Sequence, residues 1–321
     1  MEFKKYDTLP SELRSHVLSF TGARELTNYA SCSKLCNKEV QKTHIYLPEE
    51  IQIKEDPLGS AVFFPSGVQI VALTSKQLSG KIRYITVRGN KHKIGSRSTY
   101  EYDGNAHQAA VKFIEKRLKY ARIGKASSLI IDMKKWPTGL LTIPGIANYQ
   151  KWIIEIQKSM FQGFYDSIIE NPMLNIDLRL IECWTKRFSI PAQFFDTVFF
   201  QNLSGFECSF VLPEMSVNSF LSMKATRIDM IVSTLPHTAI NQKIAQWFTN
   251  PPSAKLHYFF HLVKYDGIGW NAMKDGILAN LPVQRTEEGE GIFVKCFADH
   301  ETGIKATITI NGDWVMFDTD V

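Results

Sequence analysis

Two stretches of the chain, Ile176-Asp177-Leu178-Arg179-Leu180 and Phe206-Glu207-Cys208-Ser209-Phe210, alternate apolar with polar residues. Because successive side chains of a β-strand point to opposite faces, each stretch predicts a strand with one buried face and one wet face. A strand of a doubly wound sheet is apolar on both faces. The two stretches therefore favour a sheet that carries helices on one face only.

Similar segments recur through the second half of the chain. Strands are predicted at 129–134, 174–181, 205–212, 227–232, 256–263 and 292–298, and helices at 149–161, 240–248 and 270–281. This alternation indicates an α/β fold with a parallel sheet, like an irregular leucine-rich-repeat solenoid. A doubly wound parallel sheet is the alternative.

The end of the chain predicts an antiparallel β-meander. Segments 306–310 and 313–317 read as strands, and Asn311-Gly312 between them predicts a type I′ turn, whose two central residues need positive φ. Antiparallel strands at this place would cover the exposed edge of the parallel sheet.

The N-terminal segment has a different pattern. It reads Leu9-Pro10-Ser11-Glu12-Leu13, then Val17-Leu18-Ser19-Phe20, with apolar residues at helical spacing that continue to position 30. The order of these residues resembles an F-box, the helical module by which SCF ubiquitin ligases hold a substrate receptor on a Skp family adaptor. The resemblance implies that eight residues contact the adaptor: Leu9, Pro10, Leu13, Val17, Leu18, Leu26, Ala30 and Leu35.

A second resemblance covers residues 200–317. The segment Ser204-Gly205-Phe206-Glu207-Cys208, the later Arg227-Ile228-Asp229 and their order behind an F-box are similar to the type 2 F-box-associated domain of nematodes. Together the two resemblances predict an F-box at 1–45, a β-rich connecting region at 46–104 and a leucine-rich-repeat-like substrate-binding domain at 105–321.

Composition and charge narrow the class of protein. The chain has 321 residues, of which 44% are hydrophobic and 21% charged, as in soluble globular proteins, and it has no apolar run long enough to span a membrane. Five widely spaced cysteines predict reduced thiols, so we expect a cytoplasmic or nuclear protein without membrane contact.

Basic residues concentrate in the first part of the chain. Residues 1–125 hold 21 Lys and Arg against 12 Asp and Glu, and several of the cations lie between Arg88 and Arg97. Such a loop could contact phosphates, but no interleaved aromatic residue or nucleic-acid-binding motif accompanies it, which favours a solvated loop.

Catalytic and metal-binding patterns are missing from the sequence. There is no phosphate-binding glycine loop, no nucleophile elbow and no metal-type His-Glu cluster, and the histidine pair His257 and His261 lies on a predicted strand. We therefore expect a protein that is not an enzyme and that uses neither a cofactor nor a metal.

The alternation predicts instead a recognition surface on the face without helices. Five residues are expected there at equivalent strand positions: Asp132, Asp177, Glu207, Asp229 and His257. The acids would form a negative stripe that attracts a basic target, unless Arg179 and the basic loop neutralise it, or the acids only solvate the face.

The sequence thus predicts a substrate-recognition subunit of an SCF-type ubiquitin ligase. It would bridge a Skp family adaptor, and through it a cullin scaffold, to a target protein for degradation. The nematode resemblance implies that this target could be a foreign or selfish-element toxin, with the chain as its antidote. The alternatives are an adaptor-bound module without a degradation role and a basic nucleic-acid-binding protein.

Overall fold

A computed structural model describes most of the second half of the chain and separate parts of the first half. The described residues are 9–19, 29, 32–42, 45–46, 50–56, 59–64, 68–73, 81–86, 99–101, 108, 111–112, 114–115, 118, 121–122, 128–156, 158–173, 175–182, 190–212, 215–233, 235–249, 254–262, 269–288 and 293–320. The chain forms two compact units, Met1–Trp152 and Ile153–Val321. The boundaries expected after residues 45 and 104 stay predictions.

Two short helices stand at the start of the first unit, α1 (Ser11–Ser19) and α3 (Lys34–Lys42). They pack through a small core in which Leu18 and Val40 are buried, with Leu9, Val17 and Tyr29 against them. The hydroxyl of Ser33 accepts a hydrogen bond from the Cys36 amide at 3.1 Å, as expected at the beginning of a helix. The helix predicted from the apolar residues at 13 and 17 is confirmed by α1, whereas the helix predicted around 26 and 30 falls in a segment of which the structure describes only Tyr29.

The first unit continues with a meander of short strands. These are β2 (Glu50–Asp56), β3 (Gly59–Phe64), β4 (Val68–Leu73), β5 (Lys81–Thr86) and β6 (Thr99–Glu101), paired antiparallel in chain order. Strand β8 (Ser128–Asp132) pairs parallel with β2, and β1 (Ile45–Tyr46) pairs parallel with β7 (Ala121–Arg122). Buried Ile51 and Ile53 lie beside buried Leu129 and Ile131, so alternation places the core on one face of this pair.

The predicted helix over 149–161 is wrong in its first half. Residues Lys151–Ile156 form strand β9, and the helix α5 begins only at Lys158 and ends at Glu170. The apolar positions 149, 152, 153 and 156 fit a helical period, but Trp152, Ile154 and Ile156 also alternate, and within 151–156 these three are the buried ones. Three β-branched isoleucines favour the strand. Two 3-10 helices precede it, η2 (Leu140–Thr142) and η3 (Ile146–Asn148).

The second unit is built on a parallel sheet. Its strands β10 (Asp177–Glu182), β11 (Gly205–Leu212), β12 (Arg227–Val232) and β13 (His257–Leu262) are neighbours in chain order, and all three pairings are parallel. The connections hold α6 (Ala192–Phe195), α7 (Val198–Gln201), α8 (Val217–Ser222) and α9 (His237–Thr249). The strands predicted from alternation are confirmed.

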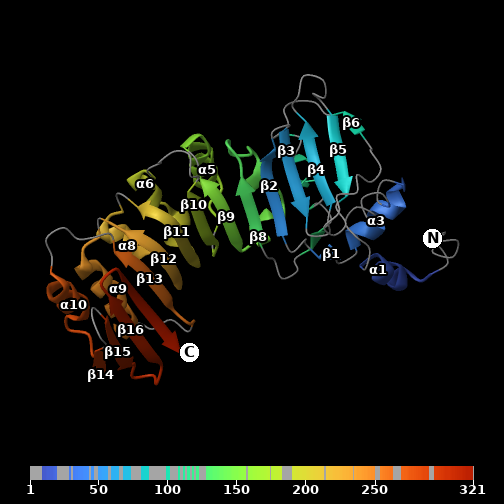
Figure 1. Ribbon diagram of the computed structural model, residues 1–321. Helices are drawn as coiled ribbons and strands as arrows, with labels where there is room; N and C mark the ends of the chain where they lie inside the picture. Colours follow the sequence, from blue (N-terminus) through green and yellow to red (C-terminus); the bar gives the residue numbers. More distant parts are fainter. Residues whose placement is uncertain are drawn as a thin grey trace. The chain divides into compact units, whose positions relative to one another are not determined.

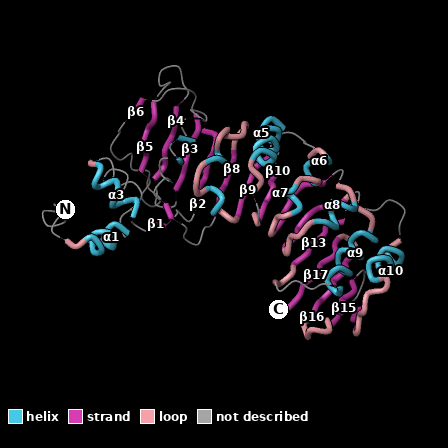
Figure 2. The backbone as a smooth tube through the Cα atoms, turned by 180° about the vertical axis from the view of Figure 1, so that it is seen from behind, coloured by secondary structure: helices cyan, strands magenta, loops and turns pink. Residues whose placement is uncertain are grey.

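The helices of the second unit cover one face of this sheet (Figure 1 and Figure 2). Aromatic contacts join the two layers: Phe200 of α7 meets Phe206 of β11 at 5.0 Å between ring centroids, and Phe220 of α8 meets Phe260 of β13 at 5.6 Å. Alternate residues of the strands are buried beneath these helices, and the residues between them are half-exposed. A doubly wound sheet, which needs both faces covered, does not fit the described part of this unit.

An antiparallel meander closes the second unit. Helix α10 (Trp270–Leu278) leads into β14 (Arg285–Glu288), β15 (Phe293–Asp299), β16 (Lys305–Asn311) and β17 (Trp314–Asp320), which pair antiparallel in chain order. Strand β17 also pairs antiparallel with β13, so the meander covers the edge of the parallel sheet as predicted.

The predicted type I′ turn of this meander is wrong. Asn311 pairs with Trp314 as a strand residue, which makes Gly312 and Asp313 the connecting pair. Asp313 is not among the described non-glycine residues with positive φ, which are Asn175 and Asn280, although a type I′ turn needs positive φ at both connecting residues. The hairpin itself is formed. The protein is thus an α/β protein with a large mixed sheet, and no helix in the described residues is long and apolar enough to cross a membrane.

Candidate functional site

The helical pair α1 and α3 presents apolar side chains that its own core does not use. Leu13 on α1 and Leu35 on α3 are 50% and 61% exposed, and Pro10 is exposed beside them in the chain. Single exposed apolar side chains are common on protein surfaces, so these two leucines are candidates for a contact with another protein because of their place on the helical pair. They are the adaptor-contact candidates that a partner can reach.

The other adaptor-contact candidates have different positions. Leu18 is 4% exposed against Val40, and Leu9 and Val17 pack on the same core, so these three hold the helices together. Leu26 and Ala30 lie outside the described residues, as does the basic loop from Arg88 to Arg97.

An ion pair fixes the two helices to each other. Arg14 of α1 lies 2.8 Å from the Glu39 carboxylate of α3, which also accepts a hydrogen bond from the Tyr29 hydroxyl at 2.5 Å. The exposed leucines are therefore mounted on helices whose relative position is held by a polar and an apolar contact.

The second candidate surface is the face of the second unit's sheet that α6 to α9 leave uncovered. We call the half-exposed side chains of β10 to β13 and β17 on this face the open face. Strand register arranges them in rows across the sheet: one row holds Asp177, Gly205, Arg227, His257 and Asp318, and the next holds Arg179, Glu207, Asp229, Phe259 and Met316.

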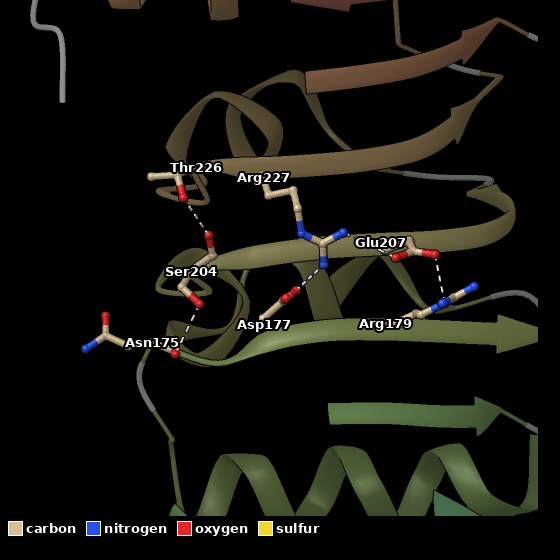
Figure 3. A network of polar contacts seen from close by, with 7 residues as sticks. All are labelled: Asn175, Asp177, Arg179, Ser204, Glu207, Thr226 and Arg227. Atoms are coloured by element: carbon tan, nitrogen blue, oxygen red, sulfur yellow. Dashed lines mark hydrogen bonds and ion pairs between the residues drawn. The ribbon is translucent and has the colours of Figure 1, made fainter. Parts of the chain in front are cut away.

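Arg227 is the centre of an ion-pair network in these rows (Figure 3). Its guanidinium lies 2.5 Å from Asp177 and 3.3 Å from Glu207, and Glu207 also lies 2.7 Å from Arg179. Burial alone would lower the pKa of Arg227, but the hydrogen bonds and charges of Asp177 and Glu207 outweigh it and raise that pKa. The network ties three neighbouring strands together.

The row geometry depends on a missing side chain at Gly205. Gly205 stands between Asp177 and Arg227 in the register, and a Cβ placed on it would lie 2.5 Å from the Asp177 carboxylate. Because Gly205 has no side chain, the Arg227 side chain can extend across strand β11 to Asp177.

The predicted negative stripe is therefore wrong as a single row. Asp177 is in register with Arg227, while Glu207 and Asp229 are two residues further along their strands. Arg179 neutralises part of the negative charge, as the sequence allowed, and Arg227 does so as well. Asp132 belongs to β8 of the first unit, where it is in register with Lys54 of β2.

Asp229 is the acid of the open face with the least compensation. Burial and the neighbouring Glu207 charge raise its pKa, while His261, His257 and Arg227 lower it less. His257 itself is held by Asp318, with 2.6 Å between Nδ1 and the carboxylate oxygen. Burial is the main cause of the raised pKa of Asp229, and the charge of Glu207 is the second.

Aromatic rings lie beside this acid. The Phe259 ring centroid is 5.5 Å from that of Trp314 at an interplanar angle of 33°, and 4.6 Å from the edge-on His261 ring. The open face thus combines charged residues on β10 to β12 with aromatic residues on β13 and β17.

A polar ladder at the beginning of the strands keeps them in step. The Ser204 hydroxyl donates to the Asn175 carbonyl, and the Thr226 hydroxyl donates to the Ser204 carbonyl, both at 3.1 Å (Figure 3). Asn175 adopts φ of 60°, a left-handed conformation that asparagine tolerates better than most residues. The ladder repeats one contact from strand to strand, as expected for stacked strand-helix units.

Sequence reasoning missed several residues of the open face. Arg227 is two residues before Asp229, so alternation alone could have placed it on this face. Trp314 and Asp318 could not be found in that way, because they reach the face only through the pairing of β17 with β13. Within the described residues, no cluster of three His, Cys, Asp or Glu side chains could hold a metal ion.

The exposed leucines of the helical pair and the charged and aromatic side chains of the open face are surfaces that can bind another molecule. Compared with known proteins, the chain matches no family model, no curated protein and no solved structure.

Proposed function

We propose that the chain is the substrate-recognition subunit of an SCF-type ubiquitin ligase. In this proposal the helices α1 and α3 belong to an F-box that binds a Skp family adaptor, and the second unit is a leucine-rich-repeat-like solenoid that binds the target protein. The catalytic steps belong to other subunits.

The observation that carries the proposal is the exposure of Leu13 and Leu35. Among the described residues the core of the helical pair buries Leu18 and Val40, and a core of this size stabilises little on its own. The apolar surface of the two exposed leucines is removed from water only when a partner protein covers it. A helical adaptor with an apolar groove would supply that cover.

The second unit supports the receptor role in a different way. Its parallel strands carry helices on one face and leave charged and aromatic side chains half-exposed on the other. Stacked strand-helix units with a free face are a common architecture for binding other proteins.

Co-purification of the full chain with the adaptor tests the proposal. Replacing Leu13 and Leu35 together by Ala should abolish adaptor binding, since truncating an anchor side chain at an interface costs about 2 kcal/mol or more. The thermal unfolding of this variant should stay close to that of the unchanged protein, because neither side chain is buried. Adaptor binding at full strength in this double variant would contradict the proposal.

A matched control removes two other exposed apolar side chains. Ile169 and Val198, in the second unit, are 55% and 58% exposed, and replacing both by Ala should leave adaptor binding unchanged. Replacing the buried Leu18 by Ala should instead weaken the helical pair itself. Cullin peptides in the purified complex would favour the degradation role, and adaptor without cullin would favour a binding module.

A further inference from the structure

The open face places a carboxylate directly beside an aromatic pair. Asp229 is in register with Phe259 on the next parallel strand, and neighbouring strands are about 4.8 Å apart. Phe259 in turn lies against Trp314, whose strand β17 pairs with β13. The acid and the two rings therefore occupy three adjacent strands of the same face.

The arginines near Asp229 form ion pairs with other acids. Arg179 and Arg227 both bind Glu207, and Arg227 also binds Asp177. The carboxylate of Asp229 forms no ion pair or hydrogen bond with any residue in the described part of the chain. The neighbouring Glu207 already pairs with both arginines, so Asp229 is the carboxylate at this place that an additional cation can bind.

Carboxylate and ring together select the chemistry of that cation. A guanidinium can donate two hydrogen bonds to a carboxylate and stack on an aromatic ring, whereas a sodium ion can do neither. The chain makes such a contact elsewhere in the same sheet, where Arg285 lies 5.6 Å and Lys295 5.2 Å from the ring centroid of Phe297. Cations within about 6 Å of a ring centroid are attracted to it.

We propose that Asp229, Phe259 and Trp314 form a binding site for an arginine side chain of the target protein. This rests on the proposed function as a receptor and specifies what its open face recognises: an arginine-bearing segment. His261 lines the site edge-on, and the pair of His257 with Asp318 closes the neighbouring row.

The probe is the peptide N-acetyl-Gly-Arg-Gly-amide, titrated into the full chain and followed by protein NMR. Its counterpart with citrulline in place of arginine has nearly the same shape without the charge. We expect saturable binding of the arginine peptide with a dissociation constant on the order of millimolar, since a single side chain provides few contacts. The citrulline peptide should bind at least about tenfold more weakly.

Two variants test the named residues. Asp229→Asn should weaken arginine binding about tenfold without lowering stability, because it removes a carboxylate that Glu207 repels. Trp314→Leu should weaken binding through loss of the ring. The matched control is Asp320→Asn, an exposed acid on β17 in register with Lys305, which should leave binding unchanged.

Equal binding of the citrulline peptide, or unchanged arginine binding in Asp229→Asn, would overturn the proposal. So would destabilisation by Asp229→Asn, which would make the acid a structural one. These outcomes are independent of the adaptor: the Leu13 and Leu35 variant should still bind arginine, and Asp229→Asn should still co-purify with the adaptor. A failure of one proposal is thereby separated from a failure of the other.

Discussion

Replacing Gly205 by Ala should break the ion pair that crosses strand β11. The new Cβ would lie 2.5 Å from the Oδ1 atom of Asp177 and 2.9 Å from its Cγ atom, both well inside van der Waals contact. The carboxylate must therefore rotate away from Arg227, whose guanidinium it now binds at 2.5 Å. The substitution acts on a contact between two other residues.

The expected effect is worked out by following each contribution. The ion pair is about one third exposed on both sides, so its loss costs roughly 0.5–1 kcal/mol after screening by solvent. The displaced side chain adds about 0.5–1.5 kcal/mol of unfavourable rotamer energy. The lower entropy of the unfolded chain with Ala offsets about 0.4–1 kcal/mol. Gly205→Ala should therefore lower the free energy of unfolding by about 1 kcal/mol.

A double-mutant cycle isolates the cause. With Asp177 already replaced by Ala, nothing is left to displace, and Gly205→Ala should be neutral or slightly stabilising. Urea unfolding of the full chain, followed by far-UV circular dichroism, should thus give a coupling energy of about 1–2 kcal/mol. A control cycle with Asp320→Ala, three strands away in the sheet, should be additive. Coupling below about 0.5 kcal/mol between positions 177 and 205 would refute the reasoning.

Two further predictions concern the helical layer of the second unit. Burial lowers the pKa of Lys243 to about 8 from an ordinary value of 10.5, while its ammonium donates to the carbonyls of Leu221 and Met223. Between about pH 8 and pH 10.5 the unfolded chain binds more protons than the folded protein does, so the free energy of unfolding should rise with pH by at most about 3 kcal/mol. In a Lys243→Met variant, urea unfolding at a series of pH values should not show this rise. In Gly276→Ala of α10, the new Cβ would clash with the His237 ring of α9, which should lower the free energy of unfolding by about 1–3 kcal/mol. A melting temperature equal to that of the unchanged protein would show that the two helices can move apart at no cost in stability.

Local alternation was enough to predict the strands of the second unit. Each buried residue of β10 and β12 is flanked by half-exposed ones, and this two-residue period is visible in the sequence alone. The same signal failed at β9, where Trp152 and Ile153 fit a helical period as well as a strand, so that pairing within the sheet decided the outcome. The local pattern of apolar residues predicts a helix or a strand only where the period of one of the two, and not of both, fits the sequence.

The candidate site needed information that no local pattern contains. Asp177 and Glu207 look equivalent in their strands, yet a register difference of two residues places Asp177 in the row of Arg227 and Glu207 in the row of Asp229. The aromatic part of the open face joins Phe259 to Trp314, which is 55 positions later in the chain. Register and long-range pairing arise from the folded sheet as a whole.

The antiparallel strand β17 has a consequence for how this protein can change in length over evolution. At the free end of a stack of parallel strand-helix units, the last strand offers unpaired backbone groups with which a duplicated unit can pair. Here those groups of β13 are already bonded to β17. A duplicated unit placed after β13 would have to displace a strand that is also paired with β16, whereas a unit inserted between β10 and β13 would keep every existing edge intact. Length variation among relatives should therefore concentrate inside the parallel stack, and the strands that carry Phe259 and Trp314 should stay neighbours.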